Sequence, residues 1–227
     1  MKRSLRSAGC IGWAVPGILG LIVWCTSTVQ SVQTPWWTWN ARAAHSQSDL
    51  VRLAIRFIVF PPADVDRSWL DEQLDWANRL FKPTQTVFTI GEVRPGDQGY
   101  ADVRTRNDRH RFGSLVHAGS IHCFVVRSLK DVDVPGRFIQ GVHWRRRRPP
   151  QSHYILLSEI AAPTVLAHEL GHFFGNHRHS EVPGNIMSYR SADGDPFFDR
   201  AQVEVIQRHV SRFLLTGELQ NIRSISE

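Results

Sequence analysis

One short segment constrains the fold of this chain more than any other, the run His-Glu-Leu-Gly-His at residues 168–172. Side chains four residues apart lie on one face of an α-helix, so in a helix His168 and His172 can both reach a single ion. Glu169 then lies beside that ion without having to bind it. A carboxylate in this position can take a proton from water at the metal and pass it to a leaving amine. The segment therefore predicts a zinc-binding helix with Glu169 as general base.

The residues on either side of the segment predict where this helix begins and ends. Pro163 suits the first helical turn, where a missing N–H does no harm. Gly175 can adopt the left-handed conformation that ends many helices. We therefore expect a helix from about residue 164 to residue 174.

The longer run HELGHFFGNHRHS, followed by NIMSY at residues 185–189, resembles the metzincin clan of zinc peptidases. The signature of that clan is HExxHxxGxxH with a later Met-turn. Within the clan the closest resemblance is to the matrixins, in which a Ser follows the third histidine and the Met lies eight residues after it. The pair His179-Ser180 and Met187 fit this spacing. The resemblance covers residues 168–189 and implies an endopeptidase with one catalytic zinc ion.

The third zinc ligand is where the sequence departs from the clan signature. Counting from His168, the third histidine should fall at position 178, which is Arg178. Arginine is permanently protonated and cannot bind a metal ion. Either one residue is inserted and His179 is the ligand, or one is deleted and His177 is. The spacing to Met187 favours His179.

Two further residues complete what the resemblance implies. In metzincins the Met-turn forms a hydrophobic floor beneath the ligands, and Met187 matches it without being expected to bind zinc. Tyr189 follows two residues later, as in the astacins and serralysins, where the equivalent tyrosine reaches the metal or stabilises the reaction intermediate. Its phenol could donate a hydrogen bond to a developing oxyanion. The alternative is an ordinary half-buried aromatic residue.

The rest of the chain predicts an α/β (α+β) domain. Strands that alternate with helices indicate a mixed, mostly parallel twisted sheet, packed against the zinc-site helix and with a C-terminal helix below the cleft. The expected strands are 51–60, 86–93, 121–126 and 154–157, with 138–144 as a candidate edge strand, and the other expected helices are 66–81 and 200–215.

The first part of the chain predicts export from the cytoplasm. A basic start precedes an apolar run over residues 8–25, which indicates a signal peptide or an N-terminal membrane anchor at residues 1–31. Residues 32–48 are expected to be a linker, and residues 49–227 the catalytic domain. The domain is then secreted or tethered to the membrane. It contains one cysteine, Cys123, so it cannot form an internal disulfide.

The charge of the chain argues against nucleic acid as a partner. The formal net charge is +6, but residues 1–48 carry four basic and no acidic residues, which leaves +2 for residues 49–227. The net positive charge of the chain therefore lies mostly in residues 1–48. We expect a monomer that acts on a protein or peptide substrate and meets the membrane only through an N-terminal anchor.

Two charged features have alternative interpretations. The run Arg145–Arg148 either attracts acidic substrates beside the edge strand 141–144 or is a solvated loop. Acidic pairs at 131/133 and 193/195 could bind Ca²⁺, but no spacing matches a calcium loop, so we expect turn residues.

Two rival functions remain open. One is a zinc hydrolase that acts on a non-protein amide such as a cell-wall peptide. The other is a non-catalytic protein with a structural zinc site, against which Glu169 argues, because a structural site has no use for that carboxylate.

Overall fold

The structure is a computed structural model that describes residues 50–146 and 152–222. The expected signal peptide or anchor and the linker lie outside the described residues. Among the helices within the described ranges, none combines the length and the apolar character that a bilayer span requires.

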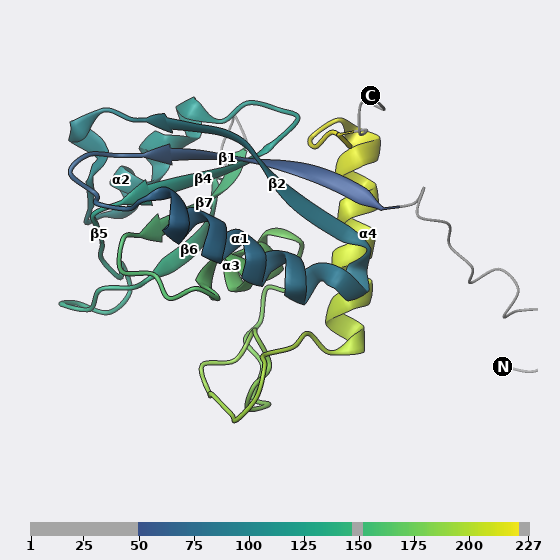
Figure 1. Ribbon diagram of the computed structural model, residues 1–227. Coiled ribbons are helices and arrows are strands. Elements are labelled where there is room, and N and C mark those ends of the chain that lie inside the picture. The colour runs from purple at the N-terminus through teal and green to yellow at the C-terminus, as the bar shows by residue number, and fades with distance from the viewer. Residues whose placement is uncertain (1–49, 147–151, 223–227) are drawn as a thin grey trace, which may run out of the picture. The chain divides into compact units, whose positions relative to one another are not determined.

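The described chain folds into one five-stranded sheet, one two-stranded sheet and several helices (Figure 1). The elements in chain order are β1 (Val51–Val59), α1 (Arg67–Phe81), the 3₁₀ turn η3 (Lys82–Thr84), β2 (Thr86–Pro95), η4 (Gln98–Tyr100), β3 (Asp102–Val103), α2 (Arg106–Arg111), η5 (Phe112–Leu115), β4 (Ile121–Val126), β5 (Ser128–Leu129), β6 (Gly141–Arg146), β7 (Ser152–Ser158), α3 (Val165–Phe173) and α4 (Arg200–Thr216).

The main sheet has the strand order β2-β1-β4-β7-β6, and only β6 runs antiparallel to its neighbour. All six residues of β4 are buried, as a strand covered by helices on both faces requires. The expected mixed, mostly parallel sheet is therefore confirmed. The edge strand begins at Gly141 instead of residue 138, because Phe138 and Ile139 pair with the segment around β5.

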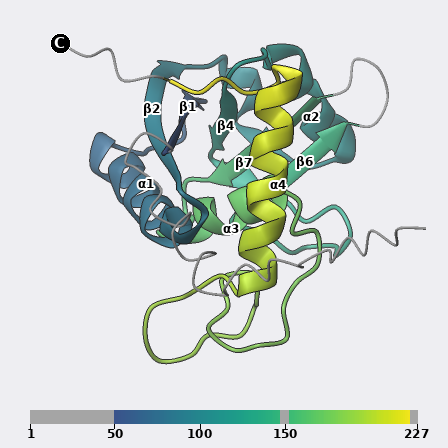
Figure 2. The ribbon, with the colours of Figure 1, turned by 90° about the vertical axis from the view of Figure 1, so that its right-hand side faces the viewer.

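Helices cover both faces of this sheet (Figures 1 and 2). Alternate strand residues point to opposite sides, so the sheet contributes to two hydrophobic clusters. Helices α1, α3 and α4 pack on one side, where Phe57, Cys123 and Ile155 belong to the larger cluster. The short elements η5, β3 and β5 pack on the other, where Phe124 and Leu156 belong to the smaller one.

The helix α2 was not expected from the sequence. It has six residues, Arg106–Arg111, all of them polar or charged, so no apolar stripe reveals it. Its start is nevertheless marked by a capping box, in which Thr105 and Asp108 exchange hydrogen bonds with each other's main chain. This four-residue signature is the sequence signal that was missed.

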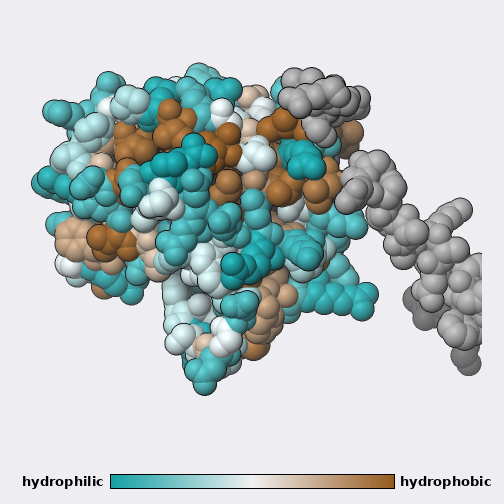
Figure 3. Space-filling model, in the orientation of Figure 1, coloured by the Kyte–Doolittle hydropathy of each residue, from teal (hydrophilic) through white to brown (hydrophobic). Residues whose placement is uncertain are grey.

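The long helices α1 and α4 follow the sequence closely. Asp66 caps α1 by accepting a hydrogen bond from the main-chain N–H of Trp69. Asp199 caps α4, which ends at Gly217 in the left-handed conformation (φ 73°). In Figure 3 the outward face of α1, across the middle of the view, is largely hydrophilic, as expected of an amphipathic helix.

A buried glutamine on α1 fixes the start of the helix that carries the candidate site. Gln73 is 1% exposed, and its Nε2 donates to the carbonyls of Ala161 (3.2 Å) and Ala162 (2.9 Å). Its Oε1 accepts from the N–H of Leu166 in the first turn of α3 at 3.0 Å. Thr164, the N-cap of α3, makes no side-chain capping bond. Gln73 therefore satisfies a helix donor that would otherwise be orphaned.

We expect Gln73→Ala to lower the free energy of unfolding by about 2–4 kcal/mol, because it leaves a buried N–H and a carbonyl without partners. Denaturant unfolding measures the effect. The matched control is Gln207→Ala on the exposed face of α4, which should change stability by less than about 0.5 kcal/mol. Equal effects of the two substitutions would contradict the role given to Gln73.

Candidate metal centre

Helix α3 brings His168, Glu169 and His172 together and then turns sharply. It spans Val165–Phe173, one residue shorter at each end than expected. Gly175 has a φ of +99° and donates its N–H to the carbonyl of His172 at 3.1 Å. The left-handed glycine predicted from the sequence is therefore present, and the chain leaves the helix into the loop that precedes α4 (Figure 1).

Both helical imidazoles are held by main-chain carbonyls. The Nδ1 of His168 lies 2.7 Å from the carbonyl oxygen of Ile186, and the Nδ1 of His172 lies 2.6 Å from that of Asn176. A carbonyl can only accept, so each Nδ1 carries the hydrogen and each Nε2 keeps its lone pair. This is the arrangement in which histidine binds a metal ion through Nε2.

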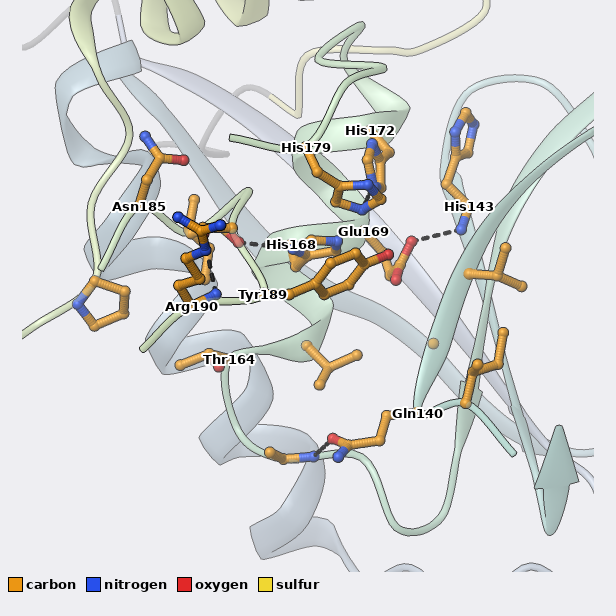
Figure 4. A pocket seen from close by; sticks show the side chains of 18 of the residues that line it. Gln140, His143, Thr164, His168, Glu169, His172, His179, Asn185, Tyr189 and Arg190 are labelled. Atoms are coloured by element: carbon orange, nitrogen blue, oxygen red, sulfur yellow. Dashed lines mark hydrogen bonds between the residues drawn. The ribbon is translucent and has the colours of Figure 1, made fainter. Parts of the chain in front are cut away.

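The loop after α3 supplies the third imidazole (Figure 4). The Nε2 atoms of His172 and His179 are 3.2 Å apart. Two nitrogens bound to one zinc ion in a tetrahedron lie about 3.3 Å apart. The ligand nitrogens of His168, His172 and His179 all lie within 4.8 Å of one another. Three converging imidazoles fit a zinc ion, the metal that most often takes such a donor set with an open fourth position.

The surroundings of the three imidazoles favour their unprotonated form. Burial lowers the pKa of His168 and of His179. Burial, with the neighbouring His168, lowers the pKa of His172 to about 4. Neutral imidazole is the form that binds a metal ion.

The two candidates for the third ligand lie in different places. His179 lies with the two helical histidines, whereas His177 lines the same cleft but is outside the group of three. The N–H of Ser180 donates to the carbonyl of Met187 at 2.8 Å, which ties the residue after His179 to the turn.

Met187 lies inside the fold and packs against the helix. It is fully buried, and a Cβ at Gly171 would collide with its sulfur. The turn around it is held by Asn185, whose Oδ1 accepts from the N–H of Met187 at 2.9 Å and from Nε2 of Gln202 at 3.1 Å. Gln202 belongs to α4, so the C-terminal helix fixes this turn. Asn185 was not singled out in the sequence, although it lies in the NIMSY run.

Glu169 is buried between α3 and the edge strand β6. Its side chain is 5% exposed, and its Oε2 accepts a hydrogen bond of 2.6 Å from the main-chain N–H of His143 (Figure 4). Burial raises the pKa of Glu169 to about 8, while the bond from His143 and the charge of Arg109 act in the opposite direction. Gly141 allows the close approach, because a Cβ there would lie 2.6 Å from Cγ1 of Val165 and 3.0 Å from Cγ of Glu169.

Tyr189 is not the half-buried aromatic of the alternative interpretation. It is 81% exposed, and its ring lies over the imidazoles, with centroids 4.2 Å from His179 and 6.2 Å from His168. Figure 4 shows its hydroxyl pointing toward Glu169. The side chain is therefore available to a substrate in the cleft.

The cleft over these residues has a volume of about 1160 Å³. Its walls come from β6, α3 and the loop before α4, and include Gly141, Val142, His143, Tyr189 and Arg190. Arg109, from α2, lines it too and is only 3% exposed, with its guanidinium over the ring of Trp144. Neither His143 nor Arg109 was identified from the sequence as a site residue, because no motif contains them.

The acidic pairs and the arginine run noted in the sequence lie in the following positions. Asp131 accepts from the main-chain N–H groups of Asp133 and Val134, as expected of a turn residue, and pairs with Arg137. Asp193 and Asp195 are exposed. Arg145 is exposed at the end of β6, and residues 147–148 of the arginine run lie outside the described residues.

The sequence matches no protein-family model and no curated protein. Among solved structures, the chain is similar to metalloproteinase-II from Bacteroides fragilis, with a TM-score of 0.50 and 12% identity over 70% of this chain and 53% of that one. It is also similar to archaemetzincin from Methanopyrus kandleri, with a TM-score of 0.49 and 16% identity over 71% of this chain and 97% of that one. The chain thus spans about half of the Bacteroides protein, with which it shares its fold.

We expect His179→Ala to lose zinc and His177→Ala to retain it, since only His179 lies with the helical histidines. The wild-type chain should contain about one zinc per chain by metal analysis. The same measurement on the two variants, after dialysis against a weak chelator, separates them. Zinc retained by His179→Ala and lost by His177→Ala would reverse the assignment.

Proposed function

We propose that this protein is a zinc-dependent endopeptidase in which His168, His172 and His179 hold the ion. The observation that carries the proposal is the convergence of three imidazoles beside a buried carboxylate, at the floor of an open cleft. The shared metalloproteinase fold supports it. The matrixin-like type rests on the motif at residues 168–189.

The three imidazoles, Glu169 and Tyr189 have separate roles in the proposed peptide hydrolysis. A zinc ion bound by the three imidazoles would lower the pKa of a water molecule and polarise the scissile carbonyl. The Oε2 of Glu169 is occupied by the N–H of His143, so Oε1 is the oxygen that takes a proton from water and later gives it to the leaving amine. The Tyr189 hydroxyl donates a hydrogen bond to the oxyanion that develops on the substrate.

The edge strand β6 offers a place for an extended peptide. It is the last strand of the sheet, and residues 141–143 line the cleft. The N–H of His143 reaches Glu169, so this residue turns its main-chain groups away from β7 and toward the cleft. A peptide that runs antiparallel to β6 would extend the sheet through main-chain groups other than the N–H of His143, which Glu169 occupies. This geometry favours a protein or peptide substrate over a compact amide.

The rival functions lack such support. In a structural zinc site a fourth protein ligand replaces water, whereas the group found among the described residues has three members. A cell-wall peptide stays an alternative substrate. Secretion or tethering by residues 1–31 and a monomeric state are part of the proposal and rest on the sequence alone.

We expect Glu169→Gln to lower kcat by about 10²–10⁴ and to leave zinc bound, because the amide keeps the bond from His143 but cannot accept a proton. The assay is cleavage of casein, with metal analysis of the same sample. Glu181→Gln is the matched control, since Glu181 is an exposed residue of the same loop region, paired with Arg190. Undiminished cleavage by the Glu169 variant would refute the assigned role.

We expect Tyr189→Phe to lower kcat by about 10², the effect of removing one oxyanion donor, without change in zinc content or stability. The substitution removes only a hydroxyl from an exposed ring. Steady-state kinetics on a peptide substrate measure kcat and KM separately. An unchanged kcat would show that the Tyr189 hydroxyl does not stabilise the oxyanion and that the ring only packs over His179.

A further inference from the structure

A series of hydrogen bonds leads from the end of α4 to the edge strand of the cleft. The carboxylate of Glu218 contacts Nε2 of His153 on β7. The Nδ1 of His153 lies 3.1 Å from Nε2 of His143 on β6. His143 in turn donates its main-chain N–H to Oε2 of Glu169 at 2.6 Å. Three elements distant in the sequence are thereby joined to the carboxylate of the candidate site.

The middle of this series is packed tightly against the zinc-site helix. His153 is 9% exposed and stacks on Phe173 with centroids 4.0 Å apart and an angle of 15° between the rings. Phe213 of α4 contacts it from another side at 5.3 Å. His143 also lies against Phe173, at 5.6 Å. His143 also lines the cleft that contains the three histidines, so the imidazole pair reaches the candidate metal centre.

The proton positions in the series follow from its acidic end. An ionised carboxylate can only accept, so Nε2 of His153 carries the hydrogen. The bond with His153 lowers the pKa of Glu218, which keeps the carboxylate ionised. The other ring nitrogen of His153, Nδ1, is then in a position to accept from Nε2–H of His143. The bonds at both ring nitrogens hold the imidazole of His153 in one orientation.

The two ends of the series differ in how the main chain holds them. Glu218 follows Gly217, the left-handed end of α4, and its carbonyl accepts from the N–H of Gly119 at 2.8 Å. At the other end, β6 is an edge strand with a partner strand on one side only. The bond from His143 to His153 gives β6 a side-chain attachment to β7 in addition to the sheet hydrogen bonds.

We propose that Glu218 and His153 are positioning residues of the proposed hydrolase, which hold His143 in place and through its main-chain N–H fix the carboxylate of Glu169. The inference rests on the proposed function, because it assigns the series to the alignment of the general base. A general base displaced by a fraction of an ångström loses much of its efficiency, so support of this kind acts on kcat.

The test compares His153→Phe and Glu218→Gln with the wild type in the full-length chain. Phenylalanine keeps a ring against Phe173 but makes no hydrogen bonds, and glutamine removes the charge of Glu218. We expect kcat to fall roughly tenfold to a hundredfold in His153→Phe and about tenfold in Glu218→Gln, the range typical of residues that orient a catalytic group. KM for a peptide substrate and zinc content should stay at wild-type values, and Glu218→Asp should recover part of the loss.

The matched control is Glu204→Gln. Glu204 lies on α4, just beyond whose end Glu218 follows; its side chain is 49% exposed against 40% for Glu218, and it pairs only locally with Arg200. Its substitution makes the same charge change and should leave kcat unaltered. The ¹⁵N chemical shifts of the imidazoles report the tautomers directly, and Glu218→Gln should change those of His153 and His143. If the series of hydrogen bonds only stabilised the fold, the substitutions would lower the melting temperature and would leave kcat unchanged at temperatures well below the melting temperature.

The outcomes separate the two proposals. A zinc-loaded wild type that cleaves no peptide would overturn the proposed function itself. An active wild type with undiminished kcat in both variants would overturn the positioning role alone. If His153→Phe does not fold, Glu218→Gln decides the question, because it replaces a partly exposed side chain at the surface.

Discussion

The geometry of the candidate site depends on two hydrogen bonds from imidazole to main chain. The carbonyls of Ile186 and Asn176 hold Nδ1 of His168 and His172, and so turn both Nε2 atoms toward the same space. Asn176 belongs to the left-handed end of the helix, and Ile186 to the turn before α4. The candidate metal centre therefore lies where a helix end and a distant turn meet, and a shift of either would turn one of the imidazoles away.

The charge of the carboxylate beside the three imidazoles depends on other interactions. Glu169 is buried, which disfavours its charge, and receives one strong hydrogen bond from β6, which favours it. Its proton affinity is set by these opposed effects, and a bound cation would add a third that favours the charge. The cleft side of β6 thus has two tasks. It bonds the carboxylate of Glu169 through the N–H of His143, and it forms the edge of the sheet along the cleft.

The C-terminal helix contributes at both of its ends. Near its start, Gln202 bonds the side chain of Asn185 and so holds the turn that contains Met187. Beyond its end, Glu218 bonds His153 and thereby reaches β6. Helix α4 contains none of the three histidines, yet the chain contacts the site through Gln202 near the start of this helix and through Glu218 just beyond its end.

The sequence by itself determined the zinc-site helix, its glycine end, the parallel strands and the two helical histidines, because these depend on local periodicity and spacing. It favoured His179 over His177 but could not place either, since a loop has no period from which directions follow. Only the tertiary structure decided that His143 meets Glu169, that Arg109 lines the cleft, and that Glu218 reaches His153. Such contacts join segments up to 65 residues apart, and their geometry is fixed by the packing of whole elements rather than by neighbours in the chain.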